Sequence, residues 1–277
     1  MKVKYTITQF NIDFPDEATC LEYIFKKRYP RAKGYYRITT RPVYVNQTGH
    51  QINPLAGTIF RKSSTPLRLW FFAIYLFSQS RHGVSAAELQ RQIGVTYKTA
   101  WRMCHLIRGL MKDGNLTLSG TVECDEAYIG GKRRLAVRRT DRNKTPVFGI
   151  VQRGGKVHAE PVNGTGEYDL YPIIHKRVKN NTRVITDGYT TYQVLKHSKR
   201  YRHKSVNHSK WEYVRVEGRT KIHTNTIEGF WSHLKRGING THHSVSKQHL
   251  ASYVNESAFR YNHRGELLFP ILLDRAV

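Results

Sequence analysis

Acidic residues are scarce in this sequence, which holds 20 Asp and Glu against 46 Lys and Arg in 277 residues and a formal net charge of +26. Such a chain repels itself in any compact state unless a polyanion compensates the charge, so nucleic acid is the first partner to consider. A ribosomal-type or merely soluble basic protein is the alternative. The content of 39% apolar and 12% aromatic residues indicates a folded core and excludes disorder over most of the length.

Cysteine and long apolar runs are also scarce. The spacing of the three cysteines fits neither a disulfide framework nor a CxxC metal site, and it suits a reducing cytosol. The longest apolar run, residues 67–77, is too short to span a bilayer and contains Arg68, so we expect a buried helix and no membrane partner. The stretch MKVKYTITQFNIDFPDE lacks an apolar core of signal-peptide length, which predicts a cytoplasmic, nucleoid-associated protein.

The first sixty residues predict a short helix over 17–27, followed by a small β element. The stretch GYYRITTRPVYVNQTGHQINPLAGTIF alternates aromatic or β-branched residues with polar ones and is punctuated by Gly, Pro and Asn. Its polar positions include Arg37 and Arg41, which could touch phosphates or simply keep the surface soluble.

Residues 66–112 are helical by period and contain the layout of a helix-turn-helix. Ser85 is placed to cap one helix in a capping box with Glu88, Gly94 breaks the chain, and Thr96 can cap a second helix. The exposed face of the second helix would carry Tyr97, Lys98, Arg102 and His105, which are residue types that reach phosphates and base edges. Many helical hairpins bind nothing, but the net charge favours DNA contact here.

The polar stretch KDGNLTLSG, residues 112–120, marks a boundary, and a different pattern follows. TVECDEAYIGG and TPVFGIVQRGGKVHAEPV read as strands, the second as a hairpin that turns at Gly154-Gly155. A helix is predicted over 168–179, a short strand over 183–187 and a later helix from about 226. Strands alternating with helices predict an α/β or α+β domain.

Two of the few acids lie on predicted strands of that domain. A period of two places Asp125 in mid-strand, on the face opposite Glu126, and strands disfavour Asp unless a turn, a buried hydrogen bond or a metal explains it. Asp187 stands where a short apolar strand ends, which is where ligands of α/β sheets gather but is also ordinary turn chemistry.

The third acid lies in HTNTIEGFWSHLKRG, residues 223–237. On a helix, Trp231 falls on the apolar side, while Glu228 and Lys235 share a polar stripe with Asn225 at its start. The stripe could be an exposed surface with a weak ion pair. If the three acids meet, they could hold two Mg²⁺ or Mn²⁺ ions for an in-line phosphoryl displacement, since hard cations prefer oxygen ligands.

These blocks resemble a known family. VECDEAYIGGK, VITDGYTTY and HTNTIEGFWSHLKRGINGTHHSVSKQHL are similar, in this order, to the three catalytic blocks of bacterial insertion-sequence transposases of the ISXO-like group, which are acidic-triad (DDE) enzymes. AGTIFRKSSTPLRLWFFAIYLF and GVTYKTAWRM resemble the group's preceding segment. The resemblance implies a ribonuclease-H-like catalytic domain over 118–277. Before it we expect a helix-turn-helix DNA-binding region over 66–115 and, over 1–65, an N-terminal helix with a small β element that is zinc-ribbon-like but lacks the ligands.

The resemblance also implies residue roles. It makes Asp125, Asp187 and Glu228 the catalytic metal ligands, with Asn225 as an alternative third residue, and Lys235 a contact to the cleaved DNA end. The further DNA-binding residues that we expect are Arg236, Lys132, Tyr97, Lys98 and Arg102. Relatives often carry a zinc ribbon of two CxxC pairs; residues 34–51 contain no cysteine, so we predict no zinc and a β element held by its aromatic residues.

The predicted function is that of a transposase. It would bind the terminal inverted repeats of an insertion sequence, as a homodimer or higher oligomer on double-stranded DNA, and cleave and transfer strands. A transposase-derived DNA-binding regulator without catalysis and a stand-alone metal-dependent nuclease are the alternatives.

Overall fold

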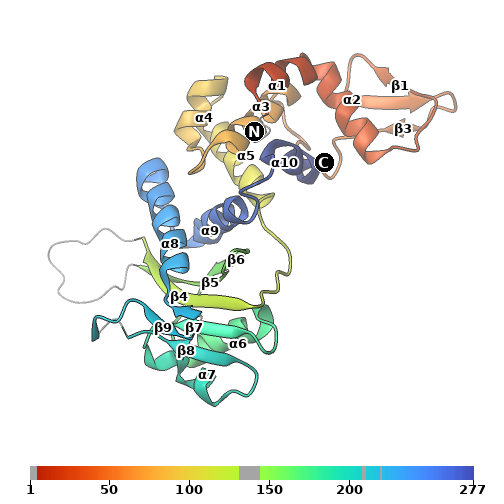
Figure 1. The fold of residues 1–277 in the computed structure, drawn as a ribbon. Helices are drawn as coiled ribbons and strands as arrows, with labels where there is room; N and C mark the ends of the chain where they lie inside the picture. The colour runs from red at the N-terminus through yellow and green to blue at the C-terminus, as the bar shows by residue number, and fades with distance from the viewer. Residues whose placement is uncertain (1–4, 131–143, 208–209, 219) are drawn as a thin grey trace. The chain divides into compact units, whose positions relative to one another are not determined.

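The chain folds into two units in a computed structural model that describes residues 5–130, 144–207, 210–218 and 220–277 (Figure 1). The first unit comprises residues 1–111 together with 265–277, and the second comprises residues 112–264. In the described part of the chain, no helix is long and apolar enough to cross a membrane.

The first unit consists of helices and a small antiparallel sheet of order β1-β2-β3, which lies beside α2 (Figure 1). Its elements are α1 (Ile7–Asp13), α2 (Glu17–Arg28), β1 (Tyr35–Ile38), β2 (Val43–Asn46), β3 (Gln51–Ile52), α3 (Leu67–Gln79), α4 (Ala86–Ile93), α5 (Tyr97–Gly109) and α10 (Leu268–Ala276). The sheet is held by aromatic packing, because the Tyr44 ring stacks on Phe25 of α2 at 3.8 Å between centroids. The Tyr44 hydroxyl also donates to Glu22 at 2.5 Å. The predicted helix and β element are therefore confirmed.

The two helices of the predicted helical hairpin are present, and their caps explain where they begin and end. Ser85 Oγ accepts from the backbone N–H of Glu88, Gly94 ends α4 at a φ of +69°, and Thr96 Oγ1 accepts from the N–H of Thr99. Glycine suits that left-handed position because it has no Cβ. The predicted capping box is wrong in one half: the Glu88 carboxylate accepts from Arg91 and from Gln92 at 2.8 Å, one turn further along the helix.

The C-terminal helix α10 belongs to the first unit, so the predicted extension of the catalytic domain to residue 277 is wrong. Phe269 packs its ring against those of Tyr5, Phe10, Phe14 and Tyr75, at centroid distances between 4.7 and 6.0 Å. The predicted division between residues 65 and 66 likewise falls inside this unit, since α2 packs on α3. Sequence periodicity identifies an apolar helix face but not the distant face that covers it.

The second unit is built on a five-stranded mixed sheet of order β6-β5-β4-β7-β8. Strands β4, β5 and β6 are antiparallel neighbours, whereas β4, β7 and β8 run parallel. The elements are β4 (Thr121–Ile129), β5 (Thr145–Gln152), β6 (Val157–Pro161), α6 (Glu167–Arg177), β7 (Arg183–Thr186), η1 (Thr190–Tyr192), α7 (Gln193–His197), β8 (Arg202–Ser205), β9 (Arg215–Glu217), β10 (Thr220–Ile222), α8 (Asn225–Arg236), η3 (Gly237–His242) and α9 (Lys247–Asn262).

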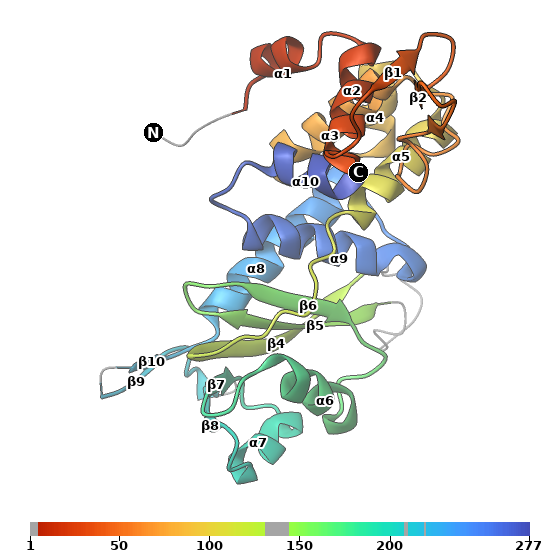
Figure 2. The same cartoon turned by 90° about the vertical axis from the view of Figure 1, so that its right-hand side faces the viewer.

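Helices cover both faces of this sheet, with α8 and α9 on one side and α6 and α7 on the other (Figures 1 and 2). The strand alternation decides which side chain meets which layer, as the period of two predicts. Val122 and Cys124 of β4 pack in the cluster between the sheet and α6, while Ala127 and Ile129 pack against α8. The predicted α/β class, the hairpin turn of 153–156 and the helix carrying Glu228 are confirmed.

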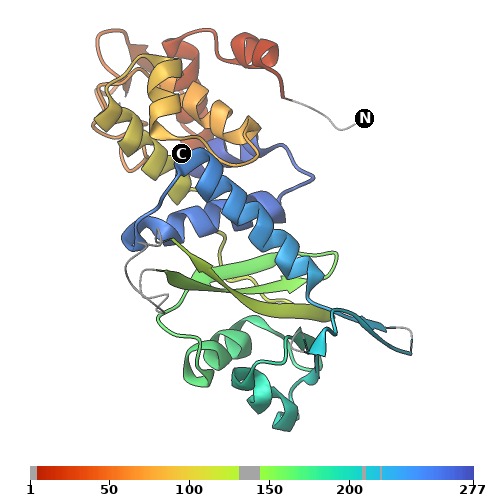
Figure 3. The same cartoon turned by 90° about the vertical axis from the view of Figure 1, so that its left-hand side faces the viewer.

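Strand β8 and the β9–β10 hairpin have no counterpart in the prediction. The hairpin extends away from the main sheet (Figures 2 and 3), and its strands are three residues long. Strand β8 reads RHKS and alternates between exposed and half-buried residues, so it lacks the apolar signal of a sheet strand. Pairing with β7, not hydrophobic pattern, fixes it in place.

Candidate active site

The register of two parallel strands brings the first two acids level. Glu123 of β4 pairs with Ile185 of β7, so Asp125 and Asp187 occupy the next equivalent positions on the same face. Neighbouring strands lie about 4.8 Å apart, which places the two side chains within electrostatic reach. Asp187 is half-buried, and its Oδ1 accepts from the backbone N–H of Tyr189 at 3.0 Å.

Helix α8 supplies the third acid from the layer that packs on this face. Ile227, Phe230, Trp231 and Leu234 are at most 4% exposed and bury the apolar side of the helix. Glu228 lies on the exposed flank beside this apolar side, where its Oε1 accepts from Thr224 Oγ1 at 2.8 Å. Amphipathicity thus turns the polar stripe toward the space above β4.

A cleft of about 720 Å³ opens between β4 and the polar stripe of α8. The acidic residues Asp125, Glu126 and Glu228 line it together with the basic residues Lys235 and Arg236, although the Glu126 side chain belongs to the opposite face of β4. The remaining lining residues are Trp231, Ser232, Asn239 and Gly240. Acids and bases therefore share one concave site in a chain that is otherwise strongly basic.

The acids influence one another. Burial, together with the negative charges of Asp187 and Glu228, raises the pKa of Asp125 to about 6, against the lowering effect of hydrogen bonds from the backbone and Trp231. Burial raises the pKa of Glu126 to about 7, with Asp125 and Asp187 adding to the rise. A buried carboxylate whose pKa is raised by neighbouring negative charges is a place where a cation is stabilised.

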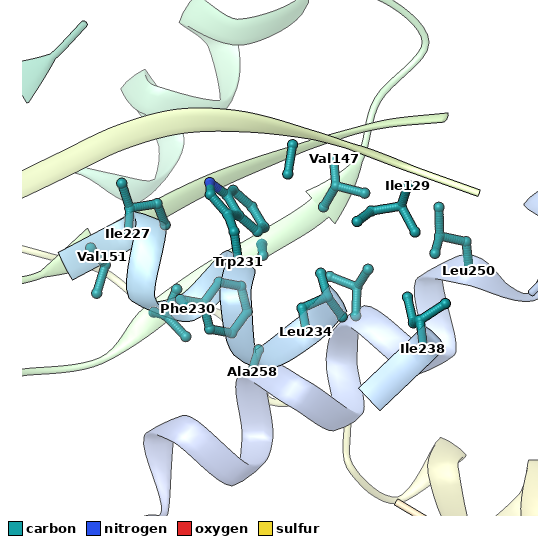
Figure 4. Packing of buried hydrophobic residues seen from close by; sticks show 14 residues of the cluster. Ile129, Val147, Val151, Ile227, Phe230, Trp231, Leu234, Ile238, Leu250 and Ala258 are labelled. Atoms are coloured by element: carbon teal, nitrogen blue, oxygen red, sulfur yellow. The ribbon is translucent and has the colours of Figure 1, made fainter. Parts of the chain in front are cut away.

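Trp231 holds Asp125 from the side of α8. Its indole Nε1–H donates to Asp125 Oδ2 at 3.0 Å, and Figure 4 shows the ring packed among Ile227, Phe230 and Leu234. The ring fits because Gly149, the partner of Asp125 across the β4–β5 ladder, has no side chain. A Cβ there would lie 2.6 Å from two ring carbons of Trp231. The sequence places Trp231 in the core, which is confirmed, but gives no sign of the bond to Asp125.

A buried ion pair fixes the start of α8, and sequence reasoning missed it. Glu123 is fully buried, accepts from Arg153 Nε at 2.7 Å, and also accepts from the backbone N–H groups of Thr226 and Ile227 at 2.8 and 3.0 Å. Arg153 in turn donates to the carbonyls of Lys221 and His223. A carboxylate at a helix N-terminus satisfies unpaired N–H groups and the helix dipole. The sequence offers one signal of this ion pair: Glu123 is an acidic residue inside a predicted strand, two residues before Asp125.

A family model describing an ISXO2-like transposase domain matches residues 117–262, from the segment before β4 to the end of α9. The chain belongs to the ISXO2-like transposase family.

Two relatives agree with this assignment. An "uncharacterized protein in transposable element ISH50" of Halobacterium salinarum is 29% identical, over 82% of this chain and 80% of its own length. An "uncharacterized transposase-like protein" of Haemophilus influenzae is 33% identical, over 39% of this chain and 81% of its own length.

A simian T-cell lymphotropic virus intasome, solved in complex with PP2A regulatory subunit B56 gamma, shares 14% identity at a TM-score of 0.31. The match covers 67% of this chain and 65%, slightly under two thirds, of that one, and it supports no conclusion at such a score.

The third acid of this ISXO2-like domain can be weighed against its neighbour. Asn225 is the first residue of α8 and is exposed, with its backbone N–H donating to His223 Nδ1 at 3.3 Å. Glu228 lines the cleft and Asn225 does not. The geometry thus favours Glu228, and its role stays a prediction.

The donor chemistry fits a hard divalent cation, because Asp125, Asp187 and Glu228 offer oxygens only. Within the ranges that the structure describes, no three His, Cys, Asp or Glu side chains lie close enough together to hold one ion.

The expected DNA-binding residues fall in different places. Lys235 and Arg236 line the cleft. Tyr97, Lys98 and Arg102 are exposed on α5, in the first unit. Lys132 lies outside the described residues.

Proposed function

We propose that this ISXO2-like chain is a DNA transposase that cleaves the ends of an insertion sequence and joins them to target DNA. The observation that supports it best is the arrangement of Asp125, Asp187 and Glu228. Asp125 and Glu228 line one cleft, Asp187 follows the strand that pairs with β4, and the charges of Asp187 and Glu228 act on Asp125 in a chain of net charge +26. The mixed sheet, with helices on both faces, would be a ribonuclease-H-like catalytic domain.

The reaction would be an in-line displacement at phosphorus. A water or a 3′-hydroxyl attacks, a new P–O bond forms, the bond to the 3′-oxygen of the cut strand breaks, and that oxygen leaves. Two Mg²⁺ or Mn²⁺ ions held by Asp125, Asp187 and Glu228 would supply nucleophile activation and charge stabilisation when bound. Lys235, exposed two turns beyond Glu228 on α8, would hold a phosphate of the reacting end, and Arg236 its neighbour.

End recognition would lie in the first unit. Helix α5, with Tyr97, Lys98 and Arg102 exposed, would enter the major groove of the terminal repeat as the second helix of a helix-turn-helix. Two ends must be handled together, so we propose a homodimer or higher oligomer on DNA. A DNA-binding regulator with a dead catalytic domain is disfavoured because the chain retains all three acids.

The test is cleavage and joining of DNA that carries the inverted repeats flanking the gene, in Mg²⁺ or Mn²⁺. The wild-type chain is compared with Asp125→Asn, Asp187→Asn and Glu228→Gln, and all should bind while only the wild type cuts. If all four bind and none cuts or joins, the enzyme proposal fails. Cutting without regard to end sequence would favour the stand-alone nuclease instead.

Asn225→Ala tests the identity of the third residue. It should retain more activity than Glu228→Gln, because Glu228 lines the cleft and Asn225 does not. A greater loss from Asn225→Ala would reverse the assignment.

A further inference from the structure

A second concentration of positive charge lies away from the cleft, in the stretch from α6 to the end of the β8 region. Residues 170–211 contain one acid, Asp187, against a chain-wide ratio of 20 acids to 46 bases. The Lys and Arg of this stretch are Lys176, Arg177, Lys179, Arg183, Lys196, Lys199, Arg200, Arg202, Lys204 and Lys210. Net charge alone does not explain such a depletion of acids.

Hydrogen bonds gather part of this charge at one edge of the sheet, where β7 and β8 begin. Arg200 donates to His175 Nε2 at 2.7 Å and to the His175 carbonyl at 3.1 Å, which ties the end of α6 to the start of β8. Arg202 donates to the Asn181 carbonyl at 2.8 Å, and the Asn181 N–H donates to the Arg200 carbonyl at 2.9 Å. We call Lys176, Lys179, Lys199, Arg200 and Arg202 the amino-edge cluster.

Two members of the cluster have a structural role. Arg200 satisfies carbonyls at the end of α6, where a cation also offsets the helix dipole, and Arg202 satisfies the carbonyl of Asn181, whose φ is +60°. The three lysines are exposed, and no described ion pair joins them to a carboxylate. Lys176 does act electrostatically on Glu160, whose pKa is lowered chiefly by His158 and to a smaller extent by Arg177 and Lys176.

The cluster lies at the opposite end of β7 from the candidate active site. Arg183 begins β7 beside Arg202 of β8, and Asp187 directly follows the strand. Four residues of strand span about 13 Å, so a phosphate on the cluster cannot be the one that reacts at Asp125 and Asp187. A duplex lying across this edge would instead be held by its backbone at a distance from the chemistry.

We propose that the amino-edge cluster binds the phosphate backbone of duplex DNA, outside the reacting end and without regard to sequence. The inference rests on the proposed function only in taking DNA as the substrate. Mutual repulsion among five cations with no described carboxylate partner is offset when phosphates replace the missing acids, and lysines on flexible stems suit a backbone contact. The DNA could be the flank of the bound element end or a separate target duplex.

Salt dependence of duplex binding tests the proposal without any cleavage. The variant Lys176→Gln/Lys179→Gln/Lys199→Gln is titrated with a short random-sequence duplex in EDTA over a range of salt concentrations. Each lysine that binds a phosphate adds about 0.9 to the slope of log K against log salt, so the slope of the triple variant should be smaller by about 2.7. Thermal unfolding should match the wild type, since the three side chains are exposed.

The matched control removes the same charge from lysines that already have a partner. Lys26, Lys27 and Lys204 pair with Glu22, Asp274 and Glu217, and their triple change to Gln should lower the slope by less than about 1. Equal slopes for the two triple variants would overturn the proposal, because the net charge of the chain alone would then explain the salt dependence of binding. An unchanged slope for the cluster variant would overturn it as well.

Repeating the titration with an end-bearing duplex distinguishes the two sources. Weaker binding to both duplexes assigns the cluster to the flank of the element end, and weaker binding to the random duplex alone assigns it to target DNA. A wild-type chain that binds but never cleaves refutes the proposed function and leaves this measurement intact.

Discussion

The Gly149→Ala substitution places one methyl group between the sheet and the helix that carries Glu228. Its Cβ would lie 2.6 Å from Cη2 and Cζ2 of Trp231 and 3.0 Å from Cδ1 of Ile227. Carbon atoms in contact prefer about 3.5–4.0 Å, so the indole must move by roughly 1 Å. The hydrogen bond from Trp231 Nε1 to Asp125 is 3.0 Å long, and it breaks if the indole moves away from Asp125 by this amount.

The magnitude follows from two costs. Overpacking a core typically costs about 1–3 kcal/mol, and breaking a hydrogen bond to a charged group costs about 1.5–3 kcal/mol. The indole ring can reduce the overpacking by moving away, but it then loses the hydrogen bond, so the two costs do not add in full. We expect the free energy of unfolding to fall by about 3 kcal/mol, which corresponds to a fall of roughly 6–12 °C in Tm. DNA cleavage should fall about 10–100-fold, as when an outer-shell partner of a ligand is removed, while DNA binding is unchanged.

Two comparisons make this prediction sharp. Gly229→Ala, on α8 itself, adds a methyl group with nothing within 4 Å and should stabilise the helix by up to about 1 kcal/mol. Trp231→Phe shortens the ring, so the double variant with Gly149→Ala should show less than the sum of the two single costs. A Gly149→Ala chain that is as stable and active as the wild type would refute the packing of Trp231 on Gly149.

Three further predictions concern other parts of the account. Glu123→Gln leaves Arg153 without its carboxylate and should lower the free energy of unfolding by about 3 kcal/mol in chemical denaturation. Glu160 is half-exposed, so Glu160→Gln should lower it by less than about 1 kcal/mol. Equal losses for the two variants would contradict the role of the buried Glu123–Arg153 ion pair. Because the pKa of Asp125 is raised from 3.8 to about 6, the folded chain binds this proton more tightly than the unfolded chain does, so stability falls as pH rises from about 4 to about 6, by at most about 3 kcal/mol. Asp125→Asn should remove that part of the pH dependence in unfolding titrations, and identical profiles for the two chains would contradict the shift. Arg102→Ala should weaken binding to the terminal repeat more than binding to random DNA, measured as a ratio of Kd values, and an unchanged ratio would exclude a base contact.

Periodicity predicted the elements that carry the site. The period of two placed Asp125 on the face opposite Glu126, and the helical period separated Glu228 from the apolar side of α8, as the structure has them. These predictions depend on local spacing alone, because burying an apolar stripe turns the polar residues outward. The level positions of Asp125 and Asp187 follow from the pairing of β4 with β7, which spacing does not contain.

Features that depend on distant partners could not be predicted. Glu123 looks like any strand acid until Arg153 and the start of α8 close around it. The bond from Trp231 to Asp125 requires Gly149 on a third element. The sequence places residues 268–276 at the end of the catalytic part, and only the contacts of α10 with aromatic residues of α1 and α3 show where this helix packs.

The central claim is that Asp125, Asp187 and Glu228 form one metal site on DNA. The most direct measurement is the number of Mn²⁺ ions bound per chain in the complex with an element-end duplex, by electron paramagnetic resonance of free Mn²⁺. We expect two tightly bound ions for the wild type and fewer in Asp125→Asn, Asp187→Asn and Glu228→Gln alike. Equal binding by the wild type and all three variants would contradict the account.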